Sequence, residues 1–149
     1  MKEIDKVGLL LNKEQKVLCE ETISNCDEAF PFFMREISLS TVERFVALFM
    51  NYDYKPICCS TIGIGSGNRV NIDIAEIFKI GLLVNAKHFI VAHNHLGSSV
   101  TPTEDDISAT QKIGYIGKIV NINLIDSLIV NSEEKCLSIR KYISERSAK

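Results

Sequence analysis

Apolar residues occur along the chain in short blocks, some with strand spacing and some with helical spacing. Arg44–Tyr52 (RFVALFMNY) is a continuous apolar run that predicts a buried strand, and Pro56–Ile62 follows a short turn as its hairpin partner. Asp73–Val84 has helical spacing that predicts a helix buried on a broad face. The other predicted elements are the strand His88–His93, a helix ending near Val120, and the strands Leu124–Val130 and Lys135–Ile139.

The order of these elements predicts the fold class. Strand pair, helix, strand, helix and strand pair indicate an α/β (α+β) domain, in which a mixed β-sheet is flanked by helices. We assign residues 36–149 to this domain. Residues 1–35 have mixed polarity and are predicted to form an N-terminal helical extension, with one helix over Lys13–Asn25.

The second long helix has a recognisable start. In Thr101-Pro102-Thr103-Glu104, Thr101 fits the N-cap, Pro102 the first helical position, and Glu104 the glutamate of a capping box. The next residues, Asp105 and Asp106, keep the first turn acidic, which suits the positive end of the helix dipole.

Composition narrows the class of protein. A chain of 149 residues with 46% hydrophobic and 24% charged residues is one globular domain that folds without help from a metal or disulfides. The net charge of −2 lacks the excess of basic residues that is typical of nucleic-acid-binding domains. The five cysteines form no Cys-x-x-Cys pair, and there is neither a signal peptide nor an apolar run long enough to span a membrane. We therefore expect a soluble cytoplasmic protein without a membrane partner.

The candidate chemistry lies with two of the three histidines. His93 and His95 are two residues apart at the end of a predicted strand, so both imidazoles project to the same side. The acidic helix start that follows holds Glu104, Asp105 and Asp106, each a candidate third ligand. Two imidazoles, one carboxylate and an open position are typical of a catalytic zinc site, in which bound water reaches a pKa of about 7. His88 has odd spacing from His93 and is predicted to be structural.

The string HNHLGSSVTPTEDD carries a family resemblance. It resembles the JAMM metallopeptidase pattern His-x-His-x7-Ser-x-x-Asp and, more closely, the RadC-like branch of the JAB/MPN superfamily. The likeness extends over about residues 40–140. It implies a single JAB/MPN-type domain with cytidine-deaminase-like layering, and a Zn²⁺ ion held by His93, His95 and Asp106. The implied activity is that of a zinc metallohydrolase, a JAMM-type peptidase or isopeptidase acting on an amide bond of a peptide or protein.

The resemblance also implies roles for two more residues. Glu43, in VERFVALFM, occupies the place of the family's general base and acid, which takes a proton from the zinc water and passes it to the leaving amine. Thr103 replaces the family's serine and keeps a hydroxyl that can stabilise an oxyanion. Leu96 replaces the proline after the second histidine, which alters the loop that shapes the substrate site.

Other functions remain as alternatives. Some JAB/MPN domains act as scaffolds without catalysis, although here all three ligands and the glutamate are present. The RadC family is also associated with DNA repair, but residues 1–35 are too short for its helix-hairpin-helix module, and the acidic charge disfavours DNA contact. An HNH nuclease needs a further histidine after His95, and a zinc deaminase needs His-x-Glu with Pro-Cys-x-x-Cys; neither pattern occurs. The sequence leaves the substrate and the oligomeric state open.

Overall fold

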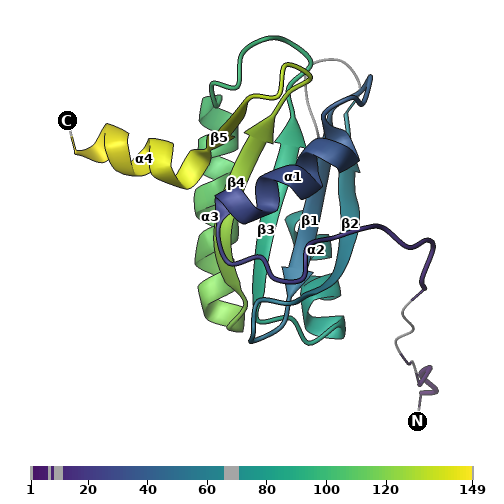
Figure 1. The fold of residues 1–149 in the computed structure, drawn as a ribbon. Coiled ribbons are helices and arrows are strands. Elements are labelled where there is room, and N and C mark those ends of the chain that lie inside the picture. The colour runs from purple at the N-terminus through teal and green to yellow at the C-terminus, as the bar shows by residue number, and fades with distance from the viewer. Residues whose placement is uncertain (1, 7, 9–11, 66–70, 149) are drawn as a thin grey trace.

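A five-stranded mixed sheet forms the centre of the domain (Figure 1). The computed structural model describes residues 2–6, 8, 12–65 and 71–148. The strands lie in the order β2-β1-β3-β4-β5, and all neighbours are antiparallel except β3 and β4, which are parallel. Their bounds are β1 Arg44–Met50, β2 Pro56–Ile64, β3 His88–Asn94, β4 Asn123–Val130 and β5 Cys136–Ser138. The predicted α/β class with a mixed sheet flanked by helices is confirmed.

The helices cover both faces of this sheet. Helix α1 (Cys26–Ile37) packs on one face, and α2 (Ile74–Leu83) and α3 (Glu104–Val120) pack on the other (Figure 1). Helix α3 is the crossover between the parallel strands β3 and β4, which need a connection of this length. Helix α4 (Ile139–Ser147) follows the edge strand β5 and projects from the body of the domain.

Alternate residues of the central strands supply two separate cores. In β1, Val46, Leu48 and Met50 face α1, whereas Phe45, Ala47 and Phe49 face α2 and α3. Both sets are buried, which explains why the strand reads as a continuous apolar run and not as an alternating one. The predicted strand and helix positions in residues 44–139 are confirmed to within a few residues at each end.

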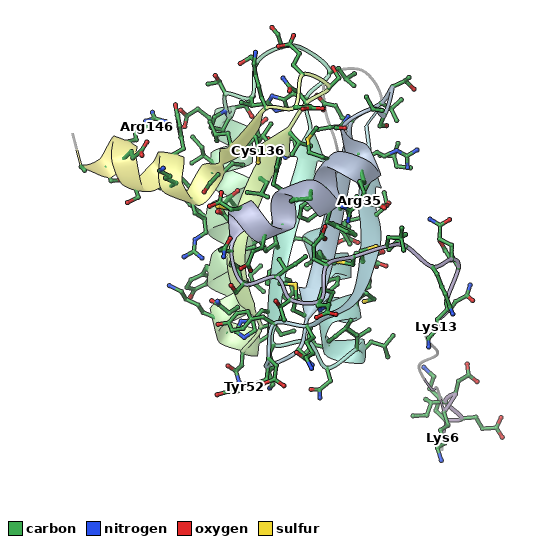
Figure 2. All side chains as sticks on the ribbon, viewed as in Figure 1. Lys6, Lys13, Arg35, Tyr52, Cys136 and Arg146 are labelled. Carbon is green, nitrogen blue, oxygen red and sulfur yellow. The ribbon has the colours of Figure 1, made fainter. Side chains whose placement is uncertain are left out.

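The helix predicted over Lys13–Asn25 is wrong. None of residues 12–25 is helical, and α1 begins at Cys26, with Asn25 as its N-cap accepting the Glu28 N–H. Tertiary contacts override helix propensity here, because Ile23 is fully buried and its N–H donates to the Tyr54 carbonyl at 2.9 Å. Pro31 lies inside α1 and is a helix breaker when read from sequence alone. The helical part of the predicted extension thus packs into the core of the sheet, whereas Lys6 and Lys13 lie away from it (Figure 2).

The start of α3 also differs from the prediction by two residues. Thr103 is the N-cap in place of Thr101, and Asp106 in place of Glu104 completes the capping box. The segment contains two overlapping capping patterns, and Thr101 is used in the preceding loop, where its N–H and hydroxyl contact Ser99 Oγ. None of the described helices has the length and apolar content needed to cross a bilayer.

Two glycines of α3 offer a matched test of packing against the sheet. A Cβ on Gly117 would lie 2.5 Å from the Ile122 carbonyl oxygen, since the chain folds back over the helix end after Asn121 adopts a φ of 59°. A Cβ on Gly114 would meet Leu124 at an ordinary 3.6 Å. We expect Gly117→Ala to lower the free energy of unfolding by about 1–3 kcal/mol. Gly114→Ala should raise it by up to about 1 kcal/mol through helix propensity. Denaturant unfolding of both variants checks this, and an equal effect of the two would contradict it.

Candidate metal centre

The candidate site lies at one end of the sheet, where β3 ends and α3 begins. His93 is in β3, opposite Phe45 of β1, and His95 follows the strand with its N–H bonded to the Val130 carbonyl at 2.9 Å. Because residues two apart project to the same face, the two imidazoles converge as the sequence predicted. The first turn of α3 brings Asp106 over them. Asp105, the rival candidate beside it, is exposed and lies outside the group.

The three side chains bring their ligand atoms together. His93 Nε2 and His95 Nε2 are 3.1 Å apart, His93 Nε2 lies 3.2 Å from Asp106 Oδ1, and His95 Nε2 lies 3.7 Å from Asp106 Oδ2. Neighbouring ligand atoms in a tetrahedral zinc site with bonds of ~2.0–2.1 Å are separated by about 3.3 Å. The donor set of two imidazoles and one carboxylate therefore fits a metal ion such as zinc both in chemistry and in spacing.

Each histidine is oriented in its own way. His95 Nδ1 lies 3.0 Å from the Ser99 carbonyl oxygen; a proton on Nδ1 makes that hydrogen bond and leaves the Nε2 lone pair facing the group. His93 is buried and stacks on Phe45, with ring centroids 6.1 Å apart and an interplanar angle of 11°. In the described part of the chain, His93 Nδ1 has no hydrogen-bond partner, so packing holds this ring.

Asp106 is held by the helix start. Its Oδ2 accepts the Thr103 N–H at 2.8 Å, which aims Oδ1 at His93. Burial acts to raise the pKa of the Asp106 carboxyl, but the close imidazoles of His93 and His95 outweigh it and hold that pKa well below the ordinary range. The nearby Asp106 carboxylate in turn raises the pKa of His95 against the opposing effect of burial. The carboxylate is thus ionised and ready to act as a ligand throughout the neutral pH range.

The other two predicted site residues lie beside this group. Glu43 immediately precedes β1 and is half-buried; since Phe45 pairs with His93, Glu43 comes on the same face, level with His95. Its negative charge also contributes to the raised pKa of His95. Thr103 is exposed, and its Oγ1 accepts the Asp106 N–H at 3.1 Å, which leaves the hydroxyl hydrogen free to donate.

A family model agrees with this arrangement of sheet, helix start and ligand group. The model described as RadC-like JAB domain matches residues 23–144. The chain belongs to the RadC-like JAB domain family. The match begins before α1 and ends within α4, so it includes all of α1 and the first part of α4.

Curated relatives of this RadC-like domain include bacterial proteins named UPF0758. The chain is 34% identical to a UPF0758 protein of Bacillus pumilus over 74% of its own length and 49% of the relative. It is 30% identical to one of Finegoldia magna over 85% of the chain and 56% of the relative. It is 29% identical to UPF0758 protein YsxA of Bacillus subtilis over 91% of the chain and 56% of the relative. The chain therefore spans about half the length of these curated relatives.

One polar residue of the RadC-like site was missed in the sequence. Asn94, between the two histidines, is fully buried; its Oδ1 accepts the Arg44 N–H at 2.7 Å and its Nδ2 donates to the Val42 carbonyl at 3.1 Å. These bonds continue the β1–β3 ladder through a side chain and fix the backbone on both sides of Glu43. A polar residue at an inward position of an apolar strand was the available signal. His88, predicted to be structural, lies at the other end of β3, stacked on Tyr54.

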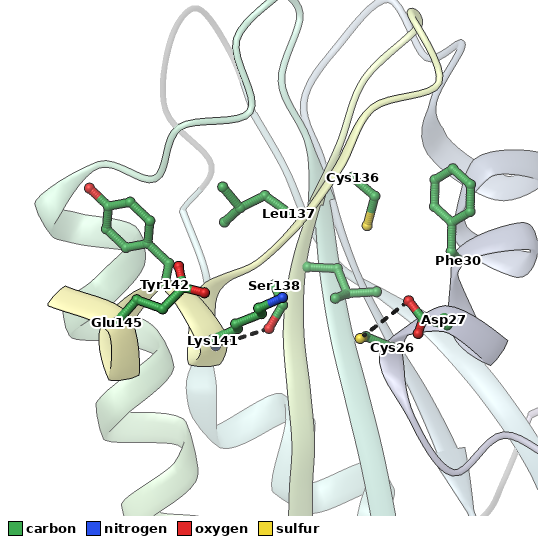
Figure 3. Close-up of a pocket in the computed structure, with 10 residues that line it drawn as sticks. Cys26, Asp27, Phe30, Cys136, Leu137, Ser138, Lys141, Tyr142 and Glu145 are labelled. Atoms are coloured by element: carbon green, nitrogen blue, oxygen red, sulfur yellow. Dashed lines mark hydrogen bonds between the residues drawn. The ribbon is translucent and has the colours of Figure 1, made fainter. Parts of the chain in front are cut away.

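The groove drawn in Figure 3 is separate from this site. It has a volume of about 550 Å³ and lies between α1, β5 and α4, lined by residues that include Cys26, Phe30, Cys136 and Tyr142. None of the three candidate ligands lines it. Cys136 is an exposed residue, and partial desolvation in the groove raises the pKa of its thiol.

Proposed function

We propose that this domain is a zinc-dependent metallohydrolase of the JAMM type that cleaves an amide bond in a peptide or protein. The observation that carries the proposal is the convergence of His93 Nε2, His95 Nε2 and the Asp106 carboxylate within 4.8 Å of one another. Glu43 outside this group, on the same face of the sheet, supplies the group that a hydrolase needs besides its metal ligands.

The ligand set is suited to catalysis as well as to binding. Three protein ligands are typical of catalytic zinc sites, whereas structural sites use four. When bound, zinc supplies Lewis acidity, which lowers the pKa of water and polarises a carbonyl group. The two buried core clusters support this role, because they give folding a driving force apart from the three ligands.

The side chains of this chain take the remaining roles. The Glu43 carboxylate takes a proton from the attacking water and delivers it to the nitrogen of the leaving amine. The Thr103 hydroxyl, whose oxygen caps α3, donates its hydrogen to the developing oxyanion. Asn94 holds the backbone around Glu43 by its two hydrogen bonds. We place this activity in the cytoplasm, which is supported by the five cysteines, all of which are free thiols.

Metal content and hydrolysis measured together test the proposal. We expect protein purified without chelator to contain close to one zinc per chain and to release new amino groups from some member of a panel of peptides and isopeptide-linked conjugates. A chelator should stop the release, added zinc should restore it, and His95→Ala should lack it. Hydrolysis that is the same in His95→Ala and wild type would contradict the proposal. A zinc-loaded wild type that cleaves no member of the panel would favour a scaffold role.

A further inference from the structure

Asn131 is a fully buried polar residue directly after β4, and both donor and both acceptor positions of its side-chain amide are used. Its Nδ2 donates to the carbonyl oxygens of Gly97 at 3.3 Å and Ser98 at 3.0 Å. Its Oδ1 accepts the N–H groups of Glu133 at 3.1 Å and Lys135 at 3.0 Å. One side chain thus joins the β4–β5 turn to the loop that follows β3.

That loop carries the acceptor that orients His95. The Ser99 carbonyl, which lies 3.0 Å from His95 Nδ1, belongs to the residue directly after Ser98. At its other end the loop is tied by the His95 N–H, which bonds to the Val130 carbonyl at 2.9 Å. The loop is therefore fixed at one end by the His95 N–H and at the other by the contact of Ser99 with His95 Nδ1. Gly97 and Ser98 lie between these two points along the chain, so a shift of their carbonyls moves the Ser99 acceptor as well.

We propose that Asn131 is a positioning residue for His95: by holding the Gly97 and Ser98 carbonyls it keeps the Ser99 acceptor in place and the His95 Nε2 lone pair facing the metal group. The inference rests on the proposed metal site. Removal of a partner that orients a ligating histidine through its second nitrogen typically lowers metal affinity by about 10–100-fold. Asn131 acts one step further out, through the backbone of the loop.

The β1–β2 hairpin provides a control that distinguishes the positioning of His95 from the formation of the turn itself. In the β1–β2 turn, Asn51 Oδ1 accepts the N–H groups of Asp53 at 2.9 Å and Lys55 at 3.0 Å, the pattern that Asn131 makes in its own turn. Within the described residues, Asn51 Nδ2 makes no hydrogen bond to a neighbouring loop. This turn contains Tyr52, which is labelled in Figure 2. Strand pairing puts it at the opposite end of the sheet from Asn131. Asn51 is therefore a matched control that builds the same turn without holding the loop.

The experiment compares Asn131→Ser with Asn51→Ser. A serine hydroxyl can still accept from the turn but cannot reach the loop, so only the Nδ2 bonds of Asn131 are lost without a substitute. We expect zinc affinity, measured by competition with a chromophoric chelator, to fall about 10-fold or more in Asn131→Ser. It should be unchanged in Asn51→Ser. Circular dichroism of both variants checks that they are folded.

A second readout needs neither metal nor substrate. Nitrogen-15 NMR of the metal-free protein at alkaline pH reports the tautomer of His95. We expect the Nδ1–H form in wild type and Asn51→Ser, and a mixture of tautomers in Asn131→Ser. Wild-type zinc affinity and wild-type tautomer in folded Asn131→Ser would overturn the inference. If Asn131→Ser does not fold, Asn131→Asp replaces it, because its second carboxylate oxygen has no hydrogen to donate to either carbonyl. A wild type that binds no zinc would refute the proposed function, whereas the tautomer would still decide the role of Asn131.

Discussion

Asp106→Ala should purify with little or no zinc, whereas Asp105→Ala should keep the wild-type metal content. Asp106 provides the single carboxylate of the candidate group, and Asp105 next to it is exposed and outside that group. Loss of a direct ligand should weaken zinc binding by more than the roughly 10–100-fold that is typical for residues behind the ligands. Elemental analysis of protein purified without chelator, followed by a competition titration, measures both variants.

A further variant separates metal ligation from helix capping. Asp106 also accepts the Thr103 N–H, so its removal weakens the start of α3 as well as the metal group. In Asp106→Asn the side-chain oxygen can still accept that N–H, but the anionic ligand is gone. We expect Asp106→Asn to retain most of the thermal stability of the metal-free protein and to lose zinc as Asp106→Ala does. Equal zinc content in wild type, Asp106→Asn and His93→Ala would refute the ligand set.

Glu43→Gln should keep its zinc and lose most of its activity. Glutamine has the shape of glutamate but cannot carry the proton between water and the leaving amine, and proton transfer by a positioned side chain typically contributes about 10²–10⁴-fold. Glu43 lies outside the three-residue group, so zinc content should match wild type. Parallel measurement of zinc and of turnover on whichever substrate the panel identifies gives both values.

A conservative change at Thr103 serves as the control for the loss of activity in Glu43→Gln. Thr103→Ser keeps the hydroxyl that caps α3 and donates to the oxyanion, so its activity should be close to wild type. Turnover by Glu43→Gln at the wild-type rate, in an assay in which His95→Ala is inactive, would exclude Glu43 as the proton carrier.

The success of the strand predictions has a simple physical basis. Strands β1 and β3 are buried on both faces, so their residues form uninterrupted apolar runs that stand out against the polar turns. The prediction from local sequence fails near the N-terminus. Lys13–Asn25 has good helix formers, but Ile23 is held in the core by a bond to the Tyr54 carbonyl, a contact between segments far apart in the chain. Local propensity contains no information about that contact.

The candidate site also has features that the sequence predicted and features that it left open. The spacing of His93 and His95 is a local property, because a strand places alternate residues on one side, and it predicted their convergence without knowledge of the sheet. The capping pattern was ambiguous by two residues, and the choice of Thr103 as N-cap is what brings Asp106 to the histidines. For Glu43, only family resemblance suggested a role, since no spacing links it to residues about fifty positions later.

The sequence by itself determined the strand order along the chain, the shared face of the two histidines and the acidic character of the helix start. These features depend on the backbone periodicity of single elements, which neighbouring residues specify. Only the tertiary structure decided which carboxylate meets the histidines, where Glu43 lies and which asparagines hold the loops. Those placements arise from strand pairing and from buried hydrogen bonds such as those of Asn94 and Asn131, which join segments that are distant in sequence.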